Sequence, residues 1–370
     1  MRLLPVIFFT LLPMTLIGQT LRVATYNASL SREAAGQLAR ELTRGSHPQI
    51  RAVGDVIKAV APDILLINEF DRDANDPSTA VADFQRNYLA PLHYPHVYHA
   101  PVNTGEPSGE DLDHDGSTQG PGDALGFGAF PGQYGMLVLS KFPIETTKVR
   151  TFQHFKWKDM PGHLMPPDWY TAEQQAMLPL SSKSHWDVPI RVGEDTLHFL
   201  VCHPTPPVFD GEEDRNGRRN HDEIRLWSDY ITPGDAEYLV DDRGERGGLE
   251  RNALFVVAGD LNADPLDGED RNTALKKLLA HPRVQSTPIP RSEGGSQAAR
   301  RQGGANRTQQ GNPAFDTGDF DDELPGNLRV DYVRPSTGFE SLDARVHWPT
   351  EKNHRHPSDH RLVFVDLRIR

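Results

Sequence analysis

Short runs of apolar, β-forming residues recur from residue 21 to the end of the chain, and they constrain its fold more than any other feature. Most of these runs are nearly continuous, which is typical of strands that are covered on both faces. They lie at residues 21–26, 63–68, 135–140, 196–202, 254–260, 329–333 and 362–367. We therefore expect buried strands in a layered protein.

Helical patterns lie between some of these runs. Residues 32–44, 49–60, 220–231 and 271–281 place apolar side chains at three- and four-residue spacing, which gives each segment one buried stripe. Strands outnumber helices without strictly alternating with them. This pattern favours packed sheets with helices outside over a doubly wound sheet or a (β/α)₈ barrel.

Four stretches are loop-like, and they account for much of the length of a 370-residue chain. They are residues 101–133, 154–187, 204–222 and 284–327. No linker divides the strand runs into two self-sufficient halves, so we expect one domain over residues 21–370 with long surface loops.

The N-terminus resembles a secretory signal peptide at residues 1–20. Arg2 precedes an apolar run from Leu3 to Leu16, and small and polar residues follow it. Because this run is shorter than the roughly 20 residues that cross a bilayer, we expect cleavage and export, to a secreted or periplasmic location. An uncleaved N-terminal anchor is the alternative, and no stable membrane span is expected in the mature chain.

Charge and cysteine content exclude several classes of site. The chain has 39 Lys+Arg against 52 Asp+Glu, a net charge of −13, which argues against a broad basic surface for nucleic acid. A nuclease whose bound cation meets the phosphate remains compatible with that charge. The single cysteine, Cys202, excludes an intramolecular disulfide and a cysteine-based metal site, and its place in a strand predicts burial.

Polar residues follow almost every strand run at its carboxyl end. One such residue is an ordinary turn former, but the whole set is difficult to explain by turns alone. It contains carboxylates for a hard cation, amides for phosphoryl oxygens and histidines for protons, as metal-assisted phosphoester hydrolysis requires. The set comprises Asn27, Glu69, His203, Asp260, Asn262, Asp331, Asp359 and His360.

In this order and on these strands, the segments TYN, INE, GDLN, RVDY and SDH resemble the endonuclease/exonuclease/phosphatase superfamily. The resemblance covers residues 21–370. It implies a four-layer α-β-β-α sandwich of two packed mixed sheets with outer helices, and a site at one rim. His203 matches the histidine of the deoxyribonuclease and sphingomyelinase branches, although Asn68 and Tyr26 replace a commoner glutamine and tryptophan.

The resemblance also implies a role for each residue. Glu69, Asn27 and Asp359 resemble the metal-side residues. Asp260 resembles the group that positions or deprotonates the attacking water, and Asn262 the amide that stabilises the transition state. The resemblance further implies that His360 contacts the phosphate with Asp331 as its partner, and that His203 protonates or stabilises the leaving oxygen.

Other groups lie outside this pattern. In DLDHDG, Asp111, Asp113 and Asp115 match half of a calcium loop, whose usual twelfth-position glutamate is replaced by Gly122; a solvated acidic loop is the alternative. The arginines after His203, among them Arg218 and Arg219, are candidate substrate-binding residues or part of a charged surface. Residues 154–170 carry apolar and aromatic side chains that are candidates for contact with nucleic acid or lipid.

These observations predict a secreted, divalent-metal-dependent phosphoester hydrolase that uses Mg²⁺, with Mn²⁺ as an alternative cation. A phosphodiesterase, including a nuclease acting on nucleic acid, is the leading subclass. The alternatives are a phosphomonoesterase or phospholipase-C-like hydrolase of small or lipid substrates, and a non-catalytic, calcium-dependent secreted binding module. The sequence implies no protein partner.

Overall fold

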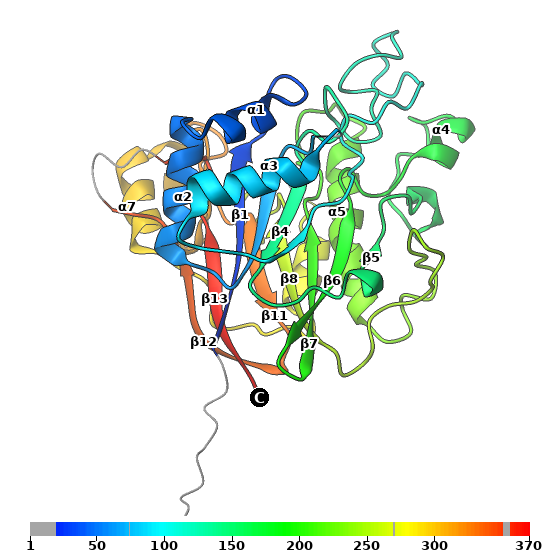
Figure 1. The fold of residues 1–370 in the computed structure, drawn as a ribbon. Coiled ribbons are helices and arrows are strands. Elements are labelled where there is room, and N and C mark those ends of the chain that lie inside the picture. The colour runs from blue at the N-terminus through cyan, green and yellow to red at the C-terminus, as the bar shows by residue number, and fades with distance from the viewer. Residues whose placement is uncertain (1–19, 74, 269–270, 351–355) are drawn as a thin grey trace, which may run out of the picture.

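The computed structural model describes residues 20–73, 75–268, 271–350 and 356–370 (Figure 1). The expected signal peptide, apart from Thr20, lies outside these residues, so the structure does not test it.

The first sheet has six strands in the order β12-β13-β1-β2-β4-β3. β1 and β2 are parallel, whereas every other neighbouring pair in this sheet is antiparallel. The strands are β1 (Leu21–Leu30), β2 (Ile64–Phe70), β3 (His96–Tyr98), β4 (Met136–Ser140), β12 (Phe339–Val346) and β13 (Val363–Ile369).

The second sheet has five strands in the order β11-β8-β7-β6-β5 and is also mixed, because β7 and β8 are parallel. Its strands are β5 (Arg150–Thr151), β6 (His185–Val192), β7 (Asp195–Cys202), β8 (Leu254–Asp260) and β11 (Asp331–Pro335). A two-stranded ribbon pairs β9 (Gly318–Asp319) with β10 (Asn327–Leu328).

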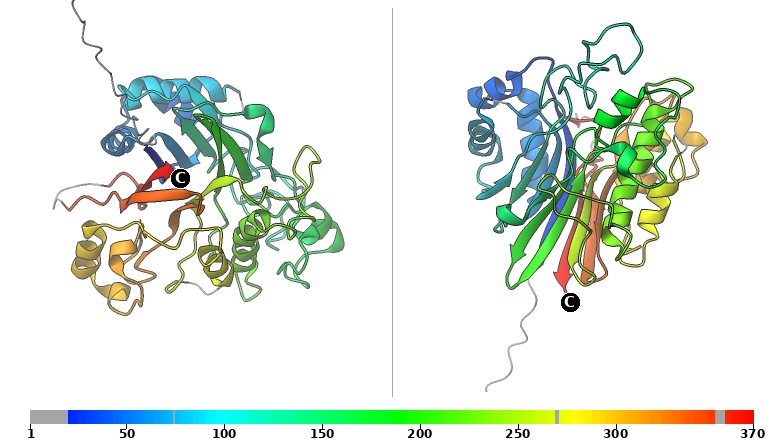
Figure 2. Two further views of the ribbon diagram at one scale, coloured as in Figure 1. Left: turned by 90° about the horizontal axis from the view of Figure 1, so that it is seen from below. Right: turned by 90° about the vertical axis from the view of Figure 1, so that its right-hand side faces the viewer.

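Helices cover the outer faces of the two packed sheets (Figure 2). The α-helices are α1 (Gln37–Arg44), α2 (Pro48–Val60), α3 (Pro77–Phe84), α4 (Ala172–Met177), α5 (Arg215–Ile231), α6 (Thr273–Leu279) and α7 (Glu293–Gln302). A π-helical turn follows α3 at Gln85–Leu89, and short 3₁₀ turns lie at Thr146–Lys148, Trp157–Asp159, Gly304–Arg307 and Pro313–Phe315. The expected four-layer α-β-β-α sandwich is confirmed.

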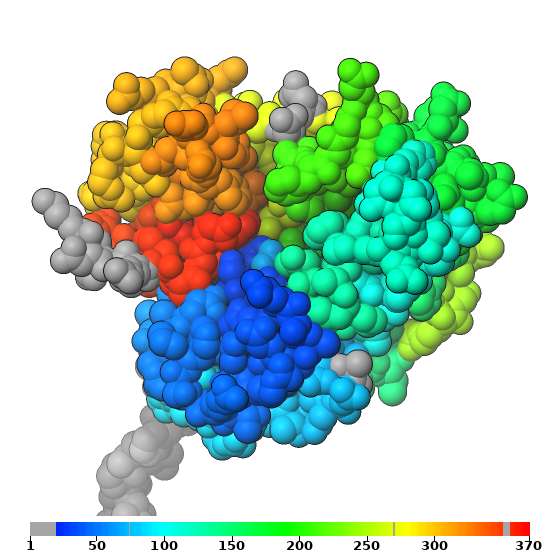
Figure 3. Space-filling view, turned by 90° about the horizontal axis from the view of Figure 1, so that it is seen from above, coloured from blue at the N-terminus to red at the C-terminus, as the bar shows by residue number. Residues whose placement is uncertain are grey.

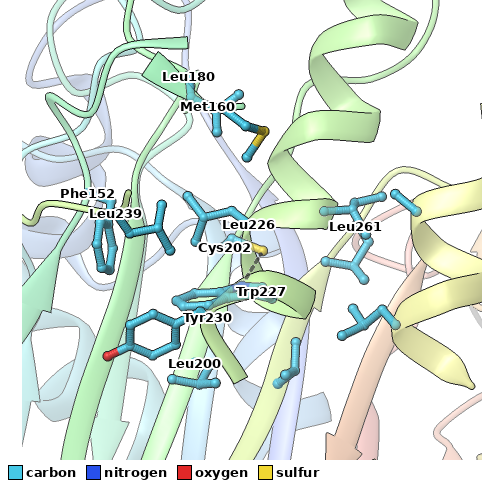
Figure 4. Close-up of a cluster of buried hydrophobic side chains, with 14 of the residues drawn as sticks. Phe152, Met160, Leu180, Leu200, Cys202, Leu226, Trp227, Tyr230, Leu239 and Leu261 are labelled. Carbon is cyan, nitrogen blue, oxygen red and sulfur yellow. Dashed lines mark hydrogen bonds between the residues drawn. The ribbon is translucent and has the colours of Figure 1, made fainter. Parts of the chain in front are cut away.

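Three buried apolar clusters fill the three spaces between the four layers. Residues such as Val23 and Phe199 fill the space between the sheets, and α1 and α2 pack on the first sheet through residues such as Leu38 and Val53. On the second sheet, the indole N–H of Trp227 in α5 donates to Cys202 Sγ across 3.1 Å (Figure 4). Cys202 is thus a core residue, as expected.

The expected loops contain more structure than their composition suggests. Residues 154–187 hold α4 and the start of β6, and residues 284–327 hold α7 and the β9–β10 ribbon. In the first stretch, Phe155, Trp157, Met160 and Met165 are buried in the core beneath α5. The expectation that these four side chains meet a substrate is therefore wrong, because they are used in packing.

Candidate active site

The candidate site lies where the carboxyl ends of β1, β2, β7 and β8 meet at one rim of the sandwich. Parallel strands end at the same edge of a sheet, so each pair carries its terminal polar residues to that edge. Figure 3 looks onto this rim and shows segments from both ends and the middle of the chain meeting around a hollow. Both sheets therefore contribute to the site.

Oδ2 of Asp260 is the meeting point of the site. Asn27 Nδ2 donates a hydrogen bond of 3.0 Å to it. His203 Nε2 lies 3.5 Å from the same oxygen and His360 Nε2 lies 3.6 Å from it. All four side chains are buried. Residues separated by more than 300 positions therefore converge on one carboxylate.

Asp331 holds His360 through a short contact of 2.9 Å between Oδ2 and Nδ1. Asp331 is the direct partner of Asp260 in the antiparallel pairing of β11 with β8, which fixes the spacing of the two carboxylates. On the other side, Ser358 Oγ accepts from the backbone N–H of His360 and lies 2.8 Å from the carbonyl oxygen of Asn27. The imidazole is thus held between the two sheets.

Glu69 joins the site through Asn27. The amide of Asn27 donates to Glu69 Oε1 across 3.1 Å, so one side chain bridges Glu69 and Asp260. Glu69 has a φ of +59°, an uncommon value for a non-glycine residue, which turns the backbone at the strand end. Asn68 beside it accepts the backbone N–H of Asp260 across 3.2 Å and so links the two sheets directly.

Burial and mutual charge set the protonation of the central groups. Burial alone would lower the pKa of His360, but Asp331 and Asp260 outweigh it and raise the pKa to about 10. Burial raises the pKa of Asp260 to about 7, against the opposing effect of His360. Burial, with Lys183 and His360 nearby, holds the pKa of His203 well below its usual value. At neutral pH the site thus combines a charged His360 with a neutral His203.

The donor set fits a hard divalent cation. Asp260, Asp331 and His360 each place one ligand atom within 4.8 Å of the others, and Asp331 Oδ1 is buried with no hydrogen-bond partner among the described residues. Glu69, which Asn27 joins to Asp260, adds a further carboxylate to this donor set. The Asn27 amide nitrogen donates to the two carboxylates, Glu69 and Asp260. Its oxygen, the atom that could bind a cation, accepts a hydrogen bond from the Ser29 N–H in this orientation.

Two expected residues lie at the edge of this arrangement. Asp359 is exposed, and its Oδ1 accepts a hydrogen bond of 3.0 Å from Ser29 Oγ; it is not part of the group around Asp260. Asn262 has a φ of +50° and donates its backbone N–H to Asp260 Oδ1 across 2.9 Å. Its side-chain amide donates to the Pro204 carbonyl across 3.1 Å.

Sequence reasoning missed Lys183. This lysine is buried and lines the same pocket as Glu69 and His203. Burial lowers its pKa, while Glu223, Glu69 and Asp260 act in the opposite direction. Lys183 lies just before β6, in a stretch that was expected to be loop, so no pattern in the sequence pointed to it.

The structure gives Arg218 and Arg219 structural partners. Arg219 Nε donates to the Leu180 carbonyl across 2.8 Å, and its Nη2 donates to the carbonyls of Leu125 and Pro179. Arg218 Nε donates to the Glu213 carbonyl across 3.0 Å. Both guanidiniums therefore tie loops to α5, and nothing in these contacts supports the expected substrate-binding role.

The three acidic residues of the DLDHDG loop do lie together. Asp111, Asp113 and Asp115 each place a carboxylate oxygen within 4.8 Å of the others. Each also accepts a nearby backbone N–H, from Gly116, Asp115 and Ser117 respectively. The structure thus brings the predicted group together at a distance that suits a cation.

The sequence pattern of the Endonuclease/Exonuclease/phosphatase family matches residues 24–360, most of the chain. The chain belongs to this family.

Solved structures agree with this family assignment at the level of the fold. An endonuclease/exonuclease/phosphatase from Beutenbergia cavernae DSM 12333 superposes with a TM-score of 0.55 at 19% identity, over 95% of this chain and 72% of that one. A family protein from Leptotrichia buccalis C-1013-b superposes with a TM-score of 0.50 at 14% identity, over 95% and 99%. No curated protein matches the chain. Within the described residues, no helix is both long and apolar enough to cross a bilayer.

Proposed function

We propose that this family member is a divalent-metal-dependent phosphodiesterase that uses Mg²⁺, with Mn²⁺ as a substitute. The observation that carries the proposal is the convergence on Asp260 Oδ2, which two histidines approach within 3.6 Å while Asn27 bridges it to Glu69. Such a group can handle a water, a phosphoryl oxygen and a leaving oxygen at once, as phosphoester hydrolysis requires.

Each residue has a definite task in this proposal. Asp260 orients the attacking water and accepts its proton. The His360 imidazolium, held by Asp331, donates to a non-bridging phosphoryl oxygen, where its charge offsets that of the phosphate. His203 lies on the other side of Asp260 and donates a hydrogen bond to the leaving oxygen. A cation bound at Glu69 would supply Lewis-acid stabilisation of the phosphate charge.

Hydrolysis of bis(p-nitrophenyl) phosphate by the purified protein tests the proposal directly. We expect turnover with Mg²⁺ or Mn²⁺, and loss of turnover with excess chelator. Asp260→Asn and His360→Ala should each lower kcat by about 10²-fold or more while the Tm shows that the fold is retained. Full turnover in both variants, or turnover that chelator leaves unchanged, contradicts the assigned roles.

We also propose that the chain is exported after removal of residues 1–20. The support is the short N-terminal apolar run behind one arginine. Mass spectrometry of protein from the culture medium or periplasm should give a mature N-terminus near residue 20. A chain that keeps Met1 and stays with the membrane fraction contradicts this proposal.

A further inference from the structure

A cavity of about 400 Å³ opens directly beside the catalytic residues. Glu69, His203 and Lys183 are among the residues that line it. Its other walls come mainly from three of the long stretches, residues 101–133, 154–187 and 204–222. This volume is within the range of small-molecule sites and suits one ring system and its sugar better than a long chain.

Aromatic side chains surround the cavity. Tyr134, Tyr170, Phe127 and Phe209 all line it. Phe127 is 64% exposed and Phe209 is 89% exposed, and they are the two aromatic residues among the exposed large apolar side chains of the described residues. Exposed phenylalanines are costly in water, so two of them on different loops around one cavity indicate a surface that meets a ligand.

The polar lining of the cavity is incompletely paired. His203 Nδ1 and Thr205 Oγ1, in two residues that line the cavity, are both buried without a hydrogen-bond partner among the described residues. Buried polar groups are almost always paired, and an unpaired one needs an explanation. A purely hydrocarbon occupant would leave both groups unpaired, whereas a ring with polar edges can pair them.

We propose that this cavity binds the leaving group of a phosphodiester and that this leaving group carries a planar aromatic ring of nucleobase size. The inference rests on the proposed function. We place the leaving group in the cavity because His203, the residue assigned to the leaving oxygen, lines it. Phe127 and Phe209 provide faces on which a ring stacks.

The reaction balances with water as the only co-reactant. The water oxygen forms the new bond to phosphorus, and its proton passes to Asp260. The bond between phosphorus and the leaving oxygen breaks, and the electron pair stays on that oxygen. A proton delivered from solvent at His203 converts the oxygen to an alcohol, so the products are a phosphomonoester and a nucleoside.

The charges around the cavity favour a compact diester over a long polyanion. Arg219 is used by three carbonyls, and Arg215 pairs with Glu213 and lies over the Trp169 ring. Asp113 adds a negative charge to the cavity wall. With a net charge of −13, the chain offers little to the backbone of a long nucleic acid.

Three dinucleoside monophosphates test the assignment: thymidylyl-thymidine and two analogues, each with one base replaced by hydrogen. Product analysis identifies the leaving nucleoside. Removing the base of that nucleoside should lower kcat/KM by about 10-fold or more, and removing the other base should change it less than about 3-fold. A dependence on the base that stays with phosphorus overturns the proposal.

Variants Phe127→Ala and Phe209→Ala, alone and together, connect the effect to this cavity. Both side chains are exposed, so the fold should survive, and Leu324→Ala, at a residue that is 77% exposed and does not line the cavity, is the matched control. The double variant should lose about 10-fold in kcat/KM on thymidylyl-thymidine. On the analogue whose leaving nucleoside has no base, the kcat/KM of the double variant should equal that of the wild-type protein.

The outcomes separate the two proposals. Equal cleavage of all three dinucleotides overturns the cavity assignment and leaves the phosphodiesterase intact. No cleavage of any of them with Mg²⁺, or of bis(p-nitrophenyl) phosphate, overturns the proposed function and the cavity assignment with it. Faster cleavage of phosphatidylcholine or sphingomyelin vesicles, lost in the double phenylalanine variant, assigns the cavity mouth to lipid and also overturns the inference.

Discussion

Nδ1 of His360 lies 2.9 Å from Oδ2 of Asp331, and the two residues are buried together between the sheets. This pairing has two consequences for the imidazole. It fixes which ring nitrogen faces Asp260, and it keeps the ring protonated at neutral pH because Asp331 and Asp260 together overcome the effect of burial.

The first prediction concerns the pH dependence of hydrolysis in Asp331→Asn. If the protonated His360 is the active form, activity falls as pH rises through its pKa, which is about 10 in the wild-type protein. Removing the Asp331 charge should move this alkaline limb down by about 1–3 pH units. The measurement is kcat from pH 6 to 10.5. Superimposable profiles for the two proteins would rule out the pairing as the cause.

The second prediction separates the two candidate metal carboxylates. Glu69→Gln keeps the size of the side chain and removes its charge, so the Mg²⁺ concentration for half-maximal activity should rise by about 10-fold or more. Asp359→Asn is the matched control, because Asp359 is exposed and accepts a hydrogen bond from Ser29 rather than from Asn27, and its effect should stay below about 3-fold. The reverse order of effects would place the cation near Asp359.

The third prediction concerns Lys183, a buried lysine that lines the cavity together with Glu69 and His203. Lys183→Met should lower kcat/KM by about 10²-fold or more, because the site loses a positive charge near the phosphate. The same change should leave the Tm unchanged or higher, since an apolar side chain of similar size replaces a buried charge. A large fall in Tm with normal activity would identify Lys183 as structural.

The fourth prediction uses Asp316, a buried carboxyl group to which the proposed reaction assigns no role. Burial, with Asp264 and Asp267 nearby, raises its pKa to about 8, so folding favours the protonated form. Above the unfolded value of 3.8 the unfolded chain ionises first, and stability falls as pH rises towards 8. Asp316→Asn removes this loss and should be more stable by about 1–3 kcal/mol at pH 8.5, with no gain at pH 3.5. Denaturant unfolding of both proteins at the two pH values measures this difference in the free energy of unfolding.

The fifth prediction concerns metal removal at the acidic loop. Calcium binding by Asp111, Asp113 and Asp115 predicts a rise of several degrees in Tm with millimolar Ca²⁺, reversed by chelator and absent in Asp113→Asn. A solvated loop predicts no difference between the two proteins. Mg²⁺ is kept constant in both arms so that the phosphoesterase site contributes equally.

The sequence predicted the fold well where hydrophobic periodicity decides it. The apolar runs ending in Asn27, Glu69 and Asp260 are strands at one rim, and the stripe through Val53 and Ile57 is the buried face of α2. The central site followed from polar residues at strand ends, since strand direction alone brings them to one edge.

The sequence did not predict the features that depend on tertiary packing. The α7 segment is rich in glycine and polar residues, so its local preference for helix is weak. Its Gly294 is required by a neighbour, because a Cβ there would lie 2.1 Å from the Trp348 carbonyl oxygen. Similarly, Arg219 was expected to bind substrate or to belong to a charged surface, whereas its guanidinium donates to three loop carbonyls. No local pattern reports such partners.

Because the site is divided between two sheets, its activity depends on how the two sheets are aligned. Asn27 and Glu69 come from the first sheet, and Asp260 and Asp331 from the second, with Asn68 linking the two. A small displacement of one sheet relative to the other would separate these residues while most of the hydrophobic core remained buried. Mild denaturant or pressure should therefore abolish hydrolytic activity at conditions where the circular dichroism spectrum still shows native secondary structure.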